Sequence, residues 1–259
     1  MTAEALGPAE GTVKSVAKVL DILEHLGAAG GPVSLSDLAR ATSLHVSTAH
    51  RLLQTLAQRG YVEQRRASRR YALGPGIVAL GGAFLAGHDL VSAAQPIVAA
   101  LRDALCETIH LGVYSDGAVL DVCNAGSPQP VGASLRTGRR DPAHCTAIGK
   151  LLLAQLPTAD LDRFLAARPL ERMTRRSIVD PEGLRAAIDR ARADDHALDE
   201  GELADGLSCV GVPVRDRAGR VVAGLSVAMP SDRFRTDRLP DWLTALRAAA
   251  ADIGRRLDA

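Results

Sequence analysis

Aromatic side chains are scarce in this chain of 259 residues, which has 3 Phe, 3 Tyr and 1 Trp. Proteins that hold single-stranded nucleic acid stack its bases on aromatic side chains, so this scarcity disfavours that class. The 4 cysteines are widely separated and none forms a Cys-x-x-Cys pair. This spacing argues against a disulfide scaffold and against a zinc ribbon.

Long apolar runs are also missing. No run approaches the roughly 20 residues that span a bilayer, and the first residues lack a charged-then-apolar signal pattern. We therefore expect a soluble cytoplasmic protein without a membrane partner. Hydrophobic residues make up 47% of the chain and charged residues 24%, which is close to the globular average, so a packed core is expected. The length fits one large domain or two small ones.

The charge is unevenly distributed, although the net charge is only +1. Residues 11–80 carry 9 basic and 4 acidic side chains, whereas residues 81–259 carry 22 basic and 24 acidic ones. A small basic segment thus precedes a larger, slightly acidic one, which hints at contact with nucleic acid.

Hydrophobic periodicity in the basic segment predicts three helices followed by two short strands. Ser34, with Asp37 three residues later, is typical of a helix cap. Gly60 ends the third helix, in which we expect Ala49, Leu52, Leu53 and Leu56 to face inward. The expected elements are residues 13–26, 35–41, 46–59, 61–63 and 70–73. This order is the outline of a winged helix-turn-helix.

The second helix of a helix-turn-helix lies in the major groove, where its first residues meet bases and phosphates. Clustered arginines between the two strands suit phosphates or the minor groove. Each feature has a plainer interpretation, since an arginine run is often a solvated tip and Ser47 or Thr48 is often a helix-start residue. Together they favour binding to double-stranded DNA. The candidate DNA contacts are Ser36, Ser47, Thr48, His50, Arg51, Arg65, Arg66, Arg69 and Arg70.

The rest of the chain alternates between predicted strands and helices. Two apolar helices, over 75–87 and 90–105, follow the basic segment, and glycines in the first make it a hinge or dimer-packing segment. Asp116-Gly117 is a strong hairpin signal. We expect strands over 108–114, 118–123, 131–135, 209–215 and 220–229, and helices over 146–156, 160–167, 181–194 and 240–257. The fold class is therefore α+β.

The sequence resembles the IclR family of bacterial transcriptional regulators over about residues 13–258. The N-terminal resemblance rests on SVAKVLDIL (15–23), LSDLAR (35–40), STAHRLL (47–53), GYV (60–62) and YALGP (71–75). It continues through ETIHL (107–111), GRR (138–140), HCTAIGK (144–150), LA (153–154), DEGE (199–202), GLSC (206–209) and PV (213–214).

The resemblance implies a winged helix-turn-helix and a GAF/PAS-like antiparallel sheet domain flanked by helices. It also implies a homodimer or dimer of dimers that controls a catabolic operon through a small organic acid effector. The expected division is a flexible tail over 1–12, the DNA-binding domain over 13–74, a linker helix over 75–89 and the effector-binding domain over 90–259. Whether the protein represses or activates stays open.

For the effector site, the resemblance implies a pocket formed by a helix start and two strands. A helix start at Thr146 offers free backbone N–H groups to a carboxylate, and Asp199 can accept a hydroxyl or water. The plainer alternatives are a core role for Cys209, a strand contact for Ser226 and a surface or ion-pair role for Lys150. The implied site residues are Thr146, Ala147, Ile148, Gly149, Asp199, Cys209 and Ser226.

The sequence departs from the family pattern at two positions. His196 stands where glycine is common, which we expect to strain the turn there. Ala228 stands where a second serine or asparagine is common, which leaves the expected pocket more apolar. A larger or aromatic acid is therefore favoured over a two- or three-carbon acid.

The competing interpretation is a thiol enzyme or a redox sensor that uses Cys145 or Cys209. Either would need an activated thiolate, and His144 is the only base beside one of them in sequence. A zinc site made of His110, His144, Cys145 and Cys209 fits no recognised ligand spacing. We expect no cofactor, no metal and no catalytic residue.

Overall fold

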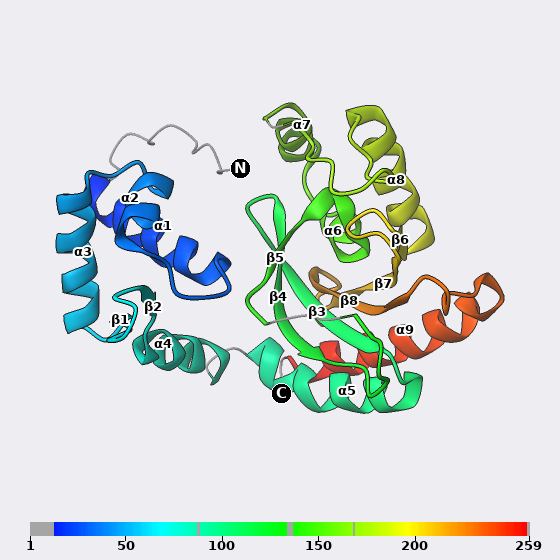
Figure 1. The fold of residues 1–259 in the computed structure, drawn as a ribbon. Coiled ribbons are helices and arrows are strands. Elements are labelled where there is room, and N and C mark those ends of the chain that lie inside the picture. Colours follow the sequence, from blue (N-terminus) through cyan, green and yellow to red (C-terminus); the bar gives the residue numbers. More distant parts are fainter. Residues whose placement is uncertain (1–12, 87–88, 134–136, 168, 258–259) are drawn as a thin grey trace. The chain divides into compact units, whose positions relative to one another are not determined.

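The computed structural model describes residues 13–86, 89–133, 137–167 and 169–257. The chain divides into two compact units, residues 1–87 and 88–259 (Figure 1). The expected flexible tail over 1–12 lies outside the described residues. No helix of the described ranges is long and apolar enough to cross a membrane.

The first unit is a winged helix-turn-helix. Its described elements are α1 (Lys14–Ala28), α2 (Leu35–Ala41), α3 (Val46–Gln58), β1 (Val62–Gln64), β2 (Tyr71–Leu73) and α4 (Pro75–Ala86). The three helices and the two-stranded wing enclose a small apolar core around the fully buried side chains of Ile22, Leu38 and Leu53. Within α3, Ala49, Leu53 and Leu56 are buried as expected, whereas Leu52 is only half-buried.

Local signals set the ends of these elements. The Ser34 hydroxyl accepts the backbone N–H of Asp37 at 3.2 Å, which is the predicted cap of α2. Gly60 follows α3 with a φ of +76°, a conformation that costs glycine little. A Cβ on Gly74 would lie 2.4 Å from the Gly60 carbonyl oxygen, so the chain entering α4 packs directly on this turn.

The second unit contains a six-stranded antiparallel sheet with strand order β5-β4-β3-β8-β7-β6. The strands are β3 (Thr108–Ser115), β4 (Ala118–Ala125), β5 (Arg140–Pro142), β6 (Ala197–Glu200), β7 (Leu207–Arg215) and β8 (Val221–Pro230). Asp116 and Gly117 join β3 to β4 with φ values of +46° and +78°, as the predicted tight hairpin requires.

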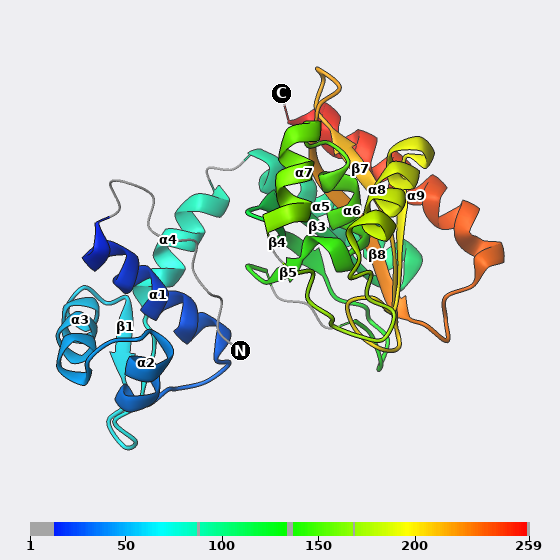
Figure 2. The ribbon, with the colours of Figure 1, turned by 90° about the horizontal axis from the view of Figure 1, so that it is seen from above.

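Helices cover both faces of this sheet (Figures 1 and 2). On one face lie α5 (Asp89–Leu105) and α9 (Leu239–Arg256), and on the other lie α6 (Ala147–Leu153), α7 (Thr158–Ala167) and α8 (Pro181–Asp194). Short 3-10 turns, Ala143–Cys145 and Thr236–Arg238, precede α6 and α9. The expected α+β class, with a winged helix-turn-helix and a GAF/PAS-like antiparallel sheet domain flanked by helices, is confirmed.

The strand expected over 131–135 is wrong in its described part, 131–133, while 134 and 135 lie outside the described residues. The Arg233 guanidinium donates to the Val131 carbonyl at 2.9 Å, and the Thr108 hydroxyl donates to the Ala133 carbonyl at 2.8 Å. Side chains therefore take the carbonyls that a strand would offer to a neighbour. β4 pairs with β3 on one side and with β5 on the other.

Candidate functional site

The first half of α3 presents a polar surface. Ser47, Thr48, His50 and Arg51 are exposed, while Ala49 between them is fully buried. Ser36 is exposed on α2, and its hydroxyl lies 3.0 Å from that of Ser34. The apolar side of α3 thus packs on the core and leaves hydroxyl and basic groups outside, which is the arrangement that the second helix of a helix-turn-helix uses on DNA.

The wing tip is held by its own backbone. The Arg65 N–H donates to the Arg70 carbonyl at 2.8 Å, and the Gln64 side-chain amide donates to the Arg69 carbonyl at 2.9 Å. The four wing arginines are all exposed. Arg65 forms an ion pair with Glu63 at 3.0 Å and Arg70 donates to the Pro32 carbonyl at 3.4 Å. Within the described residues, Arg66 and Arg69 have no acidic partner.

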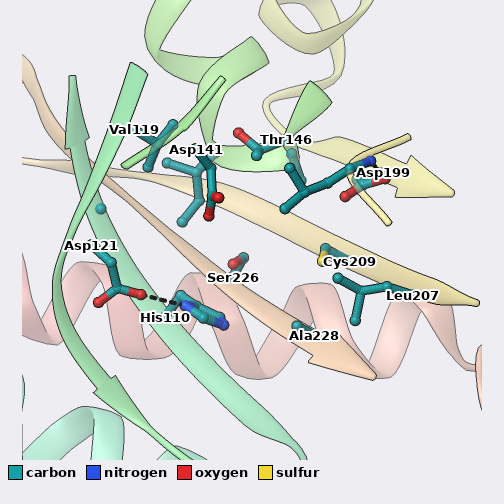
Figure 3. Close-up of a pocket in the computed structure, with 14 residues that line it drawn as sticks. His110, Val119, Asp121, Asp141, Thr146, Asp199, Leu207, Cys209, Ser226 and Ala228 are labelled. Atoms are coloured by element: carbon teal, nitrogen blue, oxygen red, sulfur yellow. Dashed lines mark hydrogen bonds and ion pairs between the residues drawn. The ribbon is translucent and has the colours of Figure 1, made fainter. Parts of the chain in front are cut away.

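The second unit contains a pocket of about 470 Å³, including space open to solvent, between the sheet and the start of α6 (Figure 3). Its lining is mostly apolar, with polar groups at a few positions. The lining residues are His110, Gly112, Val119, Asp121, Asp141, Thr146, Ala147, Ile148, Asp199, Leu203, Leu207, Cys209, Ser226 and Ala228.

Six of the seven residues that sequence assigns to the effector site line this pocket, namely Thr146, Ala147, Ile148, Asp199, Cys209 and Ser226. Gly149 does not. Its N–H donates to the Thr146 hydroxyl at 2.9 Å, so this N–H is not free for a carboxylate. A Cβ at Gly149 would lie 2.0 Å from the Ala143 carbonyl oxygen, which indicates a packing role.

Asp199 is fully buried at the end of β6. Its Oδ1 accepts the N–H groups of Glu202 at 2.7 Å and Leu203 at 3.4 Å. Its Oδ2 is buried without a hydrogen-bond partner in the described structure. Burial raises the pKa of Asp199 to about 6. Asp199 and Cys209 are register partners on β6 and β7, and the Asp199 carboxyl adds to the burial that raises the pKa of this thiol. Asp199 Oδ2 is therefore open to a ligand hydroxyl beside the Cys209 thiol.

Sequence reasoning missed three polar residues of the lining, His110, Asp121 and Asp141. His110 Nδ1 lies 2.7 Å from Asp121 Oδ2, and both side chains are buried. Burial raises the pKa of Asp141, although the guanidinium of Arg139, 2.7 Å away, opposes this. A signal existed, because alternate residues of a strand share one face: His110 and Gly112 both line the pocket.

The expected strain at His196 is wrong. The left-handed backbone at the end of α8 falls on Asp195, with a φ of +53°, a conformation that Asp tolerates better than most residues. His196 Nδ1 lies 3.0 Å from the Asp194 carbonyl oxygen, so the imidazole fits this turn.

The thiols are poorly suited to chemistry. Burial raises the pKa of Cys145 to about 11 and that of Cys209 well above its usual value, so neither is an activated thiolate. His144 Nε2 lies 2.9 Å from the Glu171 carbonyl oxygen, and burial lowers the pKa of this imidazole. Among the described residues no group of three His, Cys, Asp or Glu side chains could hold a metal ion.

A helix-turn-helix with an exposed basic wing, joined in one chain to a unit with a small-molecule pocket, defines a ligand-responsive DNA-binding regulator. Residues 15–66 match the family model "IclR helix-turn-helix domain", and residues 82–255 match "Bacterial transcriptional regulator IclR C-terminal". The chain belongs to the IclR family of transcriptional regulators.

Relatives across the family are similar over nearly the whole chain. The regulator KdgR of Escherichia coli is 34% identical over 95% of this chain and 93% of its own length. The repressor IclR of the same organism is 29% identical over 97% and 92%. These relatives are regulators of transcription, not enzymes.

Two solved structures are similar in fold. An IclR regulator from Alicyclobacillus acidocaldarius superposes with a TM-score of 0.85 at 25% identity and covers 95% of this chain and 99% of its own. An IclR homologue from Microbacterium hydrocarbonoxydans, complexed with 4-hydroxybenzoate, gives a TM-score of 0.81 at 25% identity, with 94% and 99% covered.

Proposed function

We propose that this regulator binds a pseudo-palindromic DNA operator as a homodimer or dimer of dimers, and that a small organic acid in the pocket of the second unit changes its DNA affinity. The observation that carries the proposal is the unpartnered Asp199 Oδ2, buried in a pocket whose lining is mostly apolar. A buried polar atom without a partner is costly, and a bound ligand would supply the partner. The genes under control are those of a catabolic operon.

DNA contact is assigned to the exposed polar residues of the first unit. Arg51 or His50 on α3 reaches a base edge, and Ser47 and Thr48 bind phosphates at the start of this helix. Ser36 adds a phosphate contact from α2. The wing arginines (Arg65, Arg66, Arg69 and Arg70) bind the backbone or the minor groove.

Assembly into a dimer is supported by apolar side chains that the first unit leaves uncovered. Val16 and Leu20 on α1 are 56% and 52% exposed, and Val78 and Leu80 on α4 are 76% and 58% exposed. Exposed apolar side chains grouped on short helices are typical of protein interfaces. Two copies paired about a twofold axis would present two α3 helices to the two half-sites of an operator.

The effector is assigned to the larger or aromatic organic acids. Ala228 on β8 lines the pocket and is buried, so this position presents a methyl group where related sequences offer a polar one. The relative from Microbacterium hydrocarbonoxydans binds 4-hydroxybenzoate, which makes this acid the first candidate for the present chain.

The proposal is tested by selecting genomic DNA fragments with the purified protein and sequencing them, with sedimentation of the protein alone and on the selected fragment. We expect a few palindromic sites beside a catabolic operon, each bound by two or four copies. Recovery of DNA without sequence preference, or one copy per site, contradicts the proposal. A calorimetric panel of organic acids then tests the effector class, and binding of two- or three-carbon acids alone would overturn the assignment to larger acids.

A further inference from the structure

His110 and Asp121 form a buried pair on adjacent strands, β3 and β4, at one end of the pocket (Figure 3). Asp121 Oδ2 lies 2.7 Å from His110 Nδ1, and Asp121 Oδ1 accepts a hydrogen bond from the Asn124 side-chain amide at 3.0 Å. A carboxylate that already accepts from an amide fixes the histidine proton on Nδ1. The other ring nitrogen, Nε2, is therefore the one left for a ligand.

His110 Nε2 is buried and has no hydrogen-bond partner in the described structure, while the residue as a whole is only 6% exposed. Its neighbour across the sheet is Ser226, which pairs with His110 in the β3–β8 register and lines the same pocket. Cross-strand neighbours have Cβ atoms about 5 Å apart. The imidazole and the hydroxyl thus offer two hydrogen-bonding groups to one ligand group.

Asp199 lies at the other end of the pocket from His110 and Asp121 (Figure 3). Its Oδ2 is the second buried polar atom of the lining without a partner. Apolar residues of the lining include Ile148, Leu207 and Ala228, and Ser226 and Cys209 lie between the two ends (Figure 3). A ligand that satisfies both ends needs a polar group at each extremity.

We propose that His110 Nε2, with the Ser226 hydroxyl, binds the carboxylate of the effector, and that Asp199 Oδ2 accepts a hydroxyl at its far end, so that the effector is a hydroxy-carboxylic acid. This inference rests on the proposed function, in which the pocket binds an organic acid. It adds His110 as a contact that decides specificity and Asp121 as the residue that positions it.

Binding in this orientation takes up a proton. Nε2 must carry hydrogen to donate to a carboxylate, and Nδ1–H is already committed to Asp121, so the bound imidazole is the cation. Its positive charge then lies between two carboxylates, that of Asp121 and that of the ligand.

Most other charged groups on the elements around His110 form ion pairs, and the nearby residues of β8 are uncharged. Asp141 on β5 is paired with Arg139, and Lys150 on α6 with Glu202. Arg102 and Asp103 on α5 pair with each other, and β8 contributes the uncharged Ser226 and Ala228. Asp199 on β6 is the remaining acid, and a second proton taken up there would also follow the arrival of an anion.

The test is calorimetry on the full chain with matched ligands. The aromatic set is 4-hydroxybenzoate and two analogues. Benzoate lacks the hydroxyl, and 4-hydroxybenzamide lacks the carboxylate. The aliphatic set is 6-hydroxyhexanoate and hexanoate. We expect one hydroxy acid to bind at least tenfold more tightly than its analogues, and His110→Gln to weaken it at least tenfold. The matched control, His196→Gln, lies outside the pocket and should leave the affinity unchanged.

Proton uptake gives a readout that a merely structural role would not move. Titration at pH 8 in buffers of different ionisation enthalpy should show proton uptake in the wild type and clearly less in His110→Gln. A second measurement needs no variant: ¹⁵N spectra of the histidine-labelled chain should show one imidazole that gains a proton on Nε2 when the acid binds.

The outcomes separate the two proposals. If an acid binds the wild type and His110→Gln equally, with equal proton uptake, the inference falls and the proposed function stands. If benzoate binds as tightly as its hydroxy acid, and hexanoate as tightly as its own, the assignment to hydroxy acids falls. If no organic acid of either set binds, both the inference and the proposed effector class are overturned.

Discussion

Lys150 on α6 and Glu202 in the turn after β6 form a buried ion pair, and the Lys150 ammonium also donates to the Leu198 carbonyl at 2.8 Å. The sequence predicts that Lys150 is either a surface charge or an ion-pair partner. The ion pair is what the structure shows, and Lys150 is only 4% exposed. The pair holds the turn whose N–H groups bind Asp199 Oδ1, so one side of the pocket depends on it.

The raised pKa of Asp199 makes stability depend on pH. Its value in the folded chain, about 6, lies above the usual 3.8, so the folded state binds more protons between these values and stability falls as pH rises through them. Ionising this buried group costs about 3 kcal/mol. Asp199→Asn removes that cost. We expect its unfolding free energy, relative to wild type, to increase by about this amount between pH 4 and 7, measured by urea denaturation.

A matched control for this measurement is Glu200→Gln, because Glu200 is the next residue along β6 and is exposed. The unfolding free energy of Glu200→Gln, plotted against pH, should run parallel to that of the wild type. If the plot for Asp199→Asn were also parallel, Asp199 would titrate in the folded chain as it does in the unfolded one.

Arg51 is the residue that we expect to contribute most to recognition of the DNA sequence. It is exposed on the polar side of α3, and a base-edge contact by arginine contributes about 1–3 kcal/mol of discrimination. Arg51→Ala should therefore lower the preference for the operator over random DNA by roughly 5- to 150-fold in competition binding. Arg59→Ala, at the opposite end of the same helix, should keep the preference. Equal losses on operator and random DNA would refute the assignment of Arg51 to a base.

The wing arginines should act on all DNA alike. Each phosphate contact contributes ~0.9 to the slope of log affinity against log salt, so replacing Arg65 and Arg66 by alanine should flatten the slope by nearly 2 and leave sequence preference intact. Arg66 should account for more of the loss, since Arg65 already pairs with Glu63 at 3.0 Å. An unchanged salt slope in the double variant would place the wing away from DNA.

The exposed thiol should react with an alkylating reagent much faster than the buried ones. Cys106 is exposed, whereas Cys123 and Cys145 are buried with pKa values raised to about 11. Only roughly one such buried thiol in 3000 is ionised at pH 7.5. A neutral alkylating reagent should modify Cys106 quickly and the other thiols slowly, and Cys106→Ser should abolish the fast phase. Fast labelling of Cys145 or Cys209 would restore the redox-sensor interpretation.

Features set by neighbouring residues were predictable from the sequence. The Ser34 cap and the Asp116-Gly117 turn depend on groups at most three residues apart. The strand expected over 131–135 failed because its carbonyls bond to Thr108 and Arg233, which are remote in sequence.

For the site, too, some residues were predictable from sequence motifs and others depend on the tertiary structure. Residues of the HCTAIGK and GLSC motifs led to the pocket through resemblance. The Asp116-Gly117 turn fixes the register of β3 against β4 close to the hairpin. The contact of His110 with Asp121 also depends on the register shift between Leu111 and Gly112, which the turn does not predict. Gly149 does not line the pocket, and its close packing on the Ala143 carbonyl oxygen depends on the turn before α6 and not on the motif.

In the proposed function, a ligand in the pocket of the second unit controls DNA binding by the first. The most direct measurement is the affinity of the full chain for its selected operator, with and without a bound acid, in the wild type and in Ala228→Phe. The added ring should fill the pocket that Ala228 lines. We predict that the acid changes the operator affinity of the wild type at least tenfold and leaves that of Ala228→Phe unchanged. An equal change in both proteins, or none in the wild type, would contradict the account.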